Sequence, residues 1–133
     1  MNENEKKDFD MELDKYVFEL LINVGCRYDR AGFAYIKQAV IYFFKYGCCY
    51  GAFGRVCLKI SNQYNKTPAS VKRSIERSIE RISFSSERNK INMVFHLPIY
   101  YADSGISAGE FIAVMVEQIK KKYVFIEGEV RKL

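Results

Sequence analysis

The stretch from Tyr64 to Ile82 constrains the fold more than any other, because it has the pattern of a sharp turn followed by an amphipathic helix. The hydroxyl of Thr67 can cap the first turn, and Pro68 suits the first helical position, where no backbone N–H is needed. Apolar residues then recur at helical spacing along one face, at Val71, Ile75, Ile79 and Ile82. The pattern predicts a helix that starts at Pro68 and buries this stripe.

The opposite face of the same helix is polar and rich in arginine. Arg73, Glu76, Arg77 and Glu80 fall opposite the stripe at about 100° per residue, with Ser70 beside Arg77 and Lys72 at the edge. Arginine can make two hydrogen bonds to guanine, and serine can contact a base or a phosphate. Such a face on the second of two short helices is what reading of the major groove requires.

The residues before the turn can supply the first helix of that pair. Phe53 to Tyr64 carries apolar residues that can hold a supporting helix, and Asn65 and Lys66 form the turn. The local pattern fits a DNA-binding helix-turn-helix, and it equally fits a plain helical hairpin in a small α domain.

Length and charge fit a single nucleic-acid-binding domain. The 133 residues carry a formal charge of +5, which divides into −4 over residues 1–19 and +9 over the remainder. A basic body with an acidic arm suits DNA binding. The 20 Phe and Tyr residues provide for a sizeable core. With no run of 18 apolar residues and no signal peptide, we expect a soluble, cytoplasmic protein without a membrane partner.

The whole pattern predicts an all-α fold of about six helices around the helix-turn-helix. Besides the central pair, we expect a helix through Phe9 to Val24 that Gly25 ends, then Phe33–Tyr46, a short helix at Ile91–Phe95 and a terminal helix after the capping box Ser107–Glu110. The lysines at 120–122 suit the C-terminal end of that helix, where cations are favoured, and they could also contact a phosphate.

The segment Tyr123–Ile126 has a strand-like pattern and needs a partner strand. The predicted domains are a flexible acidic arm at 1–8, the DNA-binding domain at 9–122 and a tail at 123–133.

The cysteines and the single histidine give no support for a metal site or a catalytic pair. Cys26, Cys48, Cys49 and Cys57 have no Cys-x-x-Cys spacing, and His96 is the only histidine. We therefore expect buried, reduced cysteines, no cofactor and no metal. Because no nucleophile, base or metal set is visible, we also expect no enzymatic activity.

Six segments in order resemble the DNA-binding effector domain of the master sporulation response regulator of endospore-forming bacteria. They are Leu20–Gly25, Gly32–Val40, Tyr64–Thr67, Val71–Ile75, Ile79–Glu80 and Glu110–Ala113. The resemblance covers about Leu20 to Lys122 with little gapping. It implies an all-helical promoter-binding domain, with tandem copies on DNA or a homodimer as candidate assemblies. RNA polymerase is a further candidate partner, although Ser83–Phe95 diverges where the family contacts it.

The resemblance also assigns the reading helix position by position. The arginine that matches Arg73 is retained, whereas the family's glutamate falls on Lys72 and a histidine falls on Arg77. The family's first arginine falls on Ser70 and a later one on Glu76. These changes argue against carrying the family's DNA box over to this chain. Residues 1–19 are also too few for the receiver domain of the family's regulator, so we expect a stand-alone effector domain or a fragment of a longer protein.

Two functions follow from these observations. The leading one is a sequence-specific DNA-binding regulator, whose predicted DNA-binding residues are Lys66, Thr67, Ser70, Lys72, Arg73, Glu76 and Arg77. The alternative is a protein-interaction module that modulates a full-length regulator, with Asp8–Leu21 and Tyr123–Ile126 as candidate docking segments. Specific DNA affinity separates the two.

Overall fold

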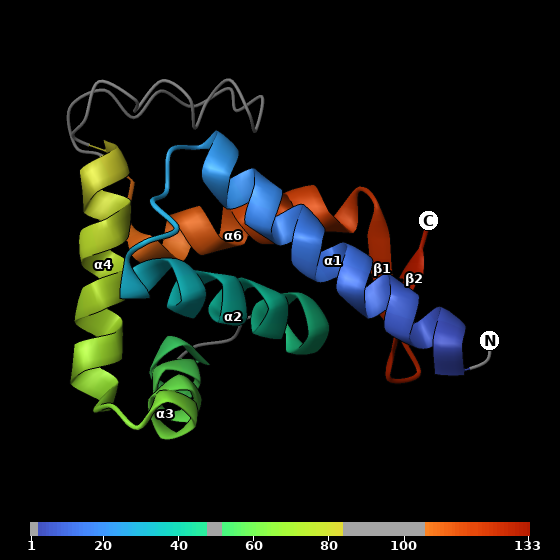
Figure 1. Cartoon of the computed structure of the whole chain (residues 1–133), viewed down its shortest axis with the longest axis horizontal. Coiled ribbons are helices and arrows are strands. Elements are labelled where there is room, and N and C mark those ends of the chain that lie inside the picture. The colour runs from blue at the N-terminus through green and yellow to red at the C-terminus, as the bar shows by residue number, and fades with distance from the viewer. Residues whose placement is uncertain (1–2, 48–51, 84–105) are drawn as a thin grey trace.

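The computed structural model describes residues 3–47, 52–83 and 106–133. Within them lie five helices and one hairpin (Figure 1): α1 Glu3–Asn23, α2 Ala31–Tyr46, α3 Ala52–Tyr64, α4 Pro68–Ser83, α6 Ala108–Lys120, β1 Tyr123–Ile126 and β2 Glu129–Lys132. The predicted helical fold around a helix-turn-helix is confirmed, with five of the roughly six expected helices in the described residues and a short C-terminal hairpin where a strand-like tail was expected. The short helix predicted at Ile91–Phe95 lies outside the described residues. Of the helices in these ranges, none is long and apolar enough to cross a membrane.

Helix α2 is the centre of the fold, because it contacts α1, α3, α4 and α6. It buries Ile36 and Ala39 completely, and the core continues into Leu21 of α1 and Phe111 and Met115 of α6. Figure 1 shows α4 standing across one end of this arrangement, while the start of α1 and the hairpin lie at the other end. The outer side of α4 is therefore far from the start of α1.

Two helix ends form as the sequence predicts. Gly25 ends α1 with φ +97°, and the N–H of Cys26 donates to the carbonyl of Leu21 at 2.9 Å. This left-handed ending favours glycine. At the start of α6, Ser107 Oγ accepts from the N–H of Glu110 at 3.1 Å, and Glu110 Oε1 accepts from the N–H of Ser107 at 3.2 Å. The predicted capping box is therefore confirmed.

The strand-like tail finds its partner within this chain. β1 pairs with β2 in antiparallel register through a two-residue turn, in which Glu127 and Gly128 have φ +54° and +75°. Two positive φ values are typical of the tight turns that join twisted strands. Val130 is fully buried, and the ring of Tyr123 lies 5.8 Å from that of Tyr16 on α1. The hairpin thus extends the core along α1.

Candidate nucleic-acid interface

The turn between α3 and α4 is built as the sequence predicts. Asn65 adopts φ +55°, and the N–H of Lys66 donates to the carbonyl of Ser61 at 2.8 Å, which closes the end of α3. Thr67 Oγ1 then accepts from the N–H of Ser70 at 3.1 Å, and Pro68 is the first residue of α4. Lys66, Thr67 and Ser70 are all exposed at this corner. The corner therefore places a lysine and two hydroxyls at the N-terminal end of α4.

The apolar stripe of α4 is buried. Val71, Ile75, Ile79 and Ile82 are at most 3% exposed, and α4 packs against both α2 and α3. The helical phase inferred from the sequence is therefore right. Because the stripe faces inward, the residues half a turn away must face solvent.

A close approach on one side of the stripe and an electrostatic effect on the other locate the remaining faces of α4. On the α2 side, Gly32 approaches so closely that an added Cβ would lie 2.6 Å from the carbonyl oxygen of Ser74 and 2.1 Å from Ser78 Oγ. On the α3 side, burial raises the pKa of the Cys57 thiol, while Lys72 lowers it and Glu76 raises it further. Those two charges therefore lie near α3.

Arg73 and Arg77 project from the face of α4 that lies opposite the buried stripe. Both are exposed, and both follow the helical row that Ser70 begins. Among the residues that the structure describes, no carboxylate lies within 4.0 Å of either guanidinium. Their donors are thus not used by ion pairs in this part of the molecule. We call the row Ser70, Arg73 and Arg77 the outward face of α4.

The acidic residues of α1, unlike Arg73 and Arg77, form ion pairs with described residues. Asp14 pairs with Lys37 of α2 at 3.1 Å, Asp10 lies 3.9 Å from Lys45 of α2, and Glu12 lies 3.6 Å from Lys132 of β2. The acids of α1 are therefore partly neutralised by the lysines around them. From Lys66 to Ser83, five cations face only two carboxylates, so α4 and its turn keep a net positive charge.

The comparison with known families agrees with this geometry. The family model for the C-terminal domain of the sporulation initiation factor Spo0A matches residues 17–119. This chain belongs to the Spo0A C-terminal domain family. That domain is a DNA-binding effector domain, and the family is not enzymatic. No curated protein sequence matches the chain significantly.

Within this Spo0A-type domain, the seven predicted DNA-binding residues are all exposed and are all carried by α4 or its turn. They divide into three groups: Lys66 and Thr67 at the N-terminal corner, Lys72 and Glu76 near α3, and the outward face. The Thr67 hydroxyl, although it caps the helix, keeps its hydrogen and can still donate.

Two features of the candidate interface and its support were not predicted from the sequence. Arg81 is exposed and lies four residues after Arg77, so it extends the arginine row by one turn. The four-residue spacing between Arg77 and Arg81 was the sequence signal that could have identified Arg81. The close approach of Gly32 to α4 has no local signal, because it depends on how two distant helices cross.

The described cysteines are structural in character. Cys26 and Cys57 are buried free thiols, as expected, and burial raises the pKa of Cys26 to about 12. Over the described ranges, no group of three or more His, Cys, Asp or Glu side chains could hold a metal ion. Cys48, Cys49 and His96 lie outside those ranges.

Proposed function

We propose that this chain is a sequence-specific, cytoplasmic transcription regulator that reads DNA with the outward face of α4. The observation that carries the proposal is the pair Arg73 and Arg77, exposed opposite a fully buried stripe and without ion pairs among the described residues. Each guanidinium can donate two hydrogen bonds to the O6 and N7 atoms of a guanine. The second helix of a helix-turn-helix is the element that presents such side chains to the major groove.

The other candidate residues fit supporting roles. Lys66 and the Thr67 hydroxyl lie at the N-terminal end of α4, where phosphate binding is favoured by the free amides and the helix dipole. Lys72 can bind a phosphate from the α3 side, and Ser70 can contact a base or a phosphate. Glu76 can accept a hydrogen bond from the amino group of cytosine.

The alternative of an interaction module has less support from the fold. Leu13, Val17, Leu20 and Leu21 of the first candidate docking segment are buried in the core. The second segment, Tyr123–Ile126, is paired with β2 and has Tyr123 buried. Met11 and Phe18 in the first segment and Ile126 in the second are exposed, but the other apolar residues of both segments are buried or partly buried. The outward face of α4, by contrast, offers arginine donors that no ion pair among the described residues uses.

Selection of bound sequences from random duplex DNA tests the proposal, and we expect the selected motif to differ from the DNA box of the family. Lys72 replaces an acid that can accept from cytosine, and a lysine cannot accept. Glu76 replaces a donor that can address guanine, and its carboxylate is repelled by the guanine acceptors. Each inversion should disfavour the family's base by about 1–3 kcal/mol.

The measurement is the affinity for the selected duplex and for a duplex with the family's box, at the same salt. Binding to the family's box should be weaker and should fall steeply with salt, because phosphate contacts remain while base contacts are lost. Tandem binding would appear as a repeated motif. Equal or tighter binding to the family's box would mean that Lys72 and Glu76 do not face the groove. A selection that enriches no motif would count against the proposed function itself.

A further inference from the structure

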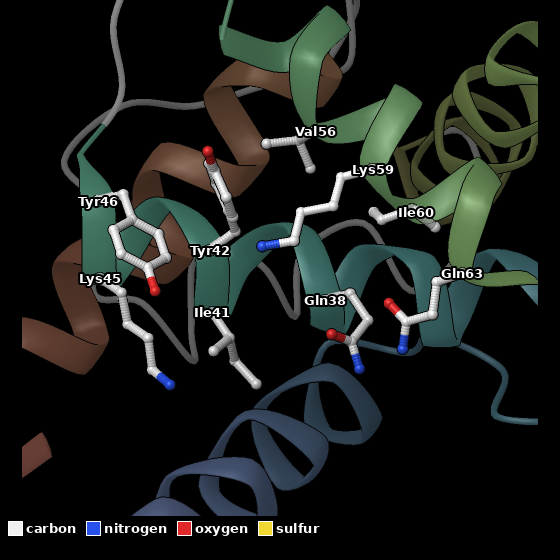
Figure 2. Close-up of a pocket in the computed structure, with 9 residues that line it drawn as sticks. All are labelled: Gln38, Ile41, Tyr42, Lys45, Tyr46, Val56, Lys59, Ile60 and Gln63. Atoms are coloured by element: carbon white, nitrogen blue, oxygen red, sulfur yellow. The ribbon is translucent and has the colours of Figure 1, made fainter. Parts of the chain in front are cut away.

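A pocket of about 150 Å³ lies between α2 and α3, on the side of α3 that faces α2. Its apolar surface comes from Ile41, Tyr42 and Tyr46 on α2 and from Val56 and Ile60 on α3 (Figure 2). A cavity of this volume accommodates one benzene ring in a protein interior. Unlike a closed core cavity, this pocket is open on one side, so a ring could enter with a polar substituent still at the mouth.

Two lysines, Lys45 and Lys59, line the pocket, and Lys59 lies beside its aromatic wall. Lys59 extends from α3 toward Tyr42, as Figure 2 shows, and its Nζ lies 4.9 Å from the ring centroid of Tyr42 and 5.9 Å from that of Tyr46. Within the ranges that the structure describes, no carboxylate lies within 4.0 Å of this ammonium group. Lys45, in contrast, has Asp10 at 3.9 Å. Of the two lysines that line the pocket, Lys59 is thus the one without a carboxylate partner among the described residues, and its ammonium group can bind an anionic ligand.

The two tyrosines shape the space beside that charge. Their ring centroids are 4.9 Å apart, and the ring planes are inclined by 53°. Tyr42 is half-buried, while Tyr46 is 63% exposed and can adjust to a guest. Gln38 and Gln63 lie together at the other end of the pocket (Figure 2) and bring amide donors and acceptors. Aromatic walls and the Lys59 ammonium group, beside a second lysine, Lys45, that is paired with Asp10, together favour a flat apolar ring that bears a negative charge.

We propose that the pocket between α2 and α3 binds a small aromatic carboxylate. The ring would lie against Tyr42, Val56 and Ile60, and the carboxylate would accept hydrogen bonds from the Lys59 ammonium group. A neutral analogue keeps the ring contacts but loses the charge-assisted hydrogen bond, and a cationic analogue is repelled. This site is separate from the outward face of α4, so the proposal does not depend on DNA binding.

Titration of the full chain, labelled with ¹⁵N, against benzoate, benzamide and benzylamine tests this assignment by NMR. Benzoate should shift the amide signals of residues 38–46 and 56–63 and leave those of residues 68–83 in place. Because a charge-assisted hydrogen bond is lost, benzamide should bind about tenfold more weakly, and benzylamine should not bind. Equal affinities for benzoate and benzamide, or shifts that spread over other lysine-bearing surfaces, would overturn the proposal.

Three variants sharpen the test. Lys59→Gln should weaken benzoate binding about tenfold, to the level of benzamide. Lys121→Gln removes another exposed lysine, at the end of α6, and should leave the affinity unchanged. Ile41→Trp adds a ring at the pocket wall and should abolish binding. Lys59 is exposed, so its replacement should not unfold the chain. An unchanged affinity in Lys59→Gln would overturn the assignment, as would an equal loss in Lys121→Gln.

Discussion

Replacement of Ile75 by aspartate is expected to unfold the domain under conditions in which the wild-type chain is folded. Ile75 is fully buried in the middle of the α4 stripe, where α4 packs against α2 and α3. The variant loses the burial of a large aliphatic side chain and forces a carboxyl group into the core. The two losses together should lower the free energy of unfolding by at least about 5 kcal/mol, which is comparable with the lower part of the total of about 5–15 kcal/mol for a typical domain.

Thermal unfolding followed by circular dichroism measures this effect. Ile75→Val keeps the site apolar and should lower the free energy of unfolding by only about 0.5–1.5 kcal/mol. Arg73→Asp places the same carboxylate on the outward face, where it should leave the fold intact. A cooperative transition of Ile75→Asp at the wild-type midpoint would show that the stripe is not buried.

Replacement of Gly32 by alanine is expected to force α2 and α4 apart. A Cβ at this position would lie 2.6 Å from the carbonyl oxygen of Ser74 and 2.1 Å from Ser78 Oγ. The serine hydroxyl can rotate away, but the carbonyl belongs to the backbone of α4 and cannot. Overpacking of this kind usually costs about 1–3 kcal/mol, and we expect a value near the upper end because backbone must move.

Gly54→Ala is the matched control for this prediction. Gly54 also lies within a helix, α3, but nothing lies within 4 Å of its added Cβ. That variant should gain about 0.5–1 kcal/mol, because alanine is the better helix former. Chemical denaturation of both variants gives the comparison. A similar gain in Gly32→Ala would show that α2 and α4 do not cross as closely as the structure has them.

The local features of the fold could be predicted because each is encoded within a few residues. Thr67 and Pro68 mark the start of α4, Ser107 and Glu110 form a capping box, and Gly25 ends α1. The buried face of α4 followed from the spacing of four aliphatic residues. In each case a single chemical requirement, such as a cap or a positive φ, is met by a residue type with few alternatives.

Features that depend on distant partners could not be predicted. β2 runs from Glu129 to Lys132 and has one apolar residue, Val130, so its own sequence pattern does not predict a strand. The role of Gly32 depends on the crossing of α2 and α4, which no local pattern reveals. Likewise, the acids of α1 suggested an acidic surface, but Asp14 and Glu12 lie against Lys37 and Lys132, which are remote in sequence.

The candidate interface could be predicted only in part. The phase of α4 located its exposed face, which the structure confirms, but the sequence could not show whether the arginines were paired with carboxylates. The structure adds that no described carboxylate reaches Arg73 or Arg77 and that Lys72 and Glu76 lie toward α3. That separation makes Arg73 the sharpest probe, because it lies on the outward face and is the position at which the sequence resemblance predicts a retained arginine.

Parallel selections from random duplex DNA, with the wild-type chain and with Arg73→Ala, test the central claim most directly. If Arg73 reads a base, the variant should lose about 1–3 kcal/mol of affinity for the wild-type site and lose the preference at one position of the motif, while the other positions are kept. Its thermal midpoint should stay at the wild-type value, because Arg73 is exposed. A variant that selects the same motif and binds it as tightly as the wild-type chain would contradict the claim that the outward face of α4 reads DNA.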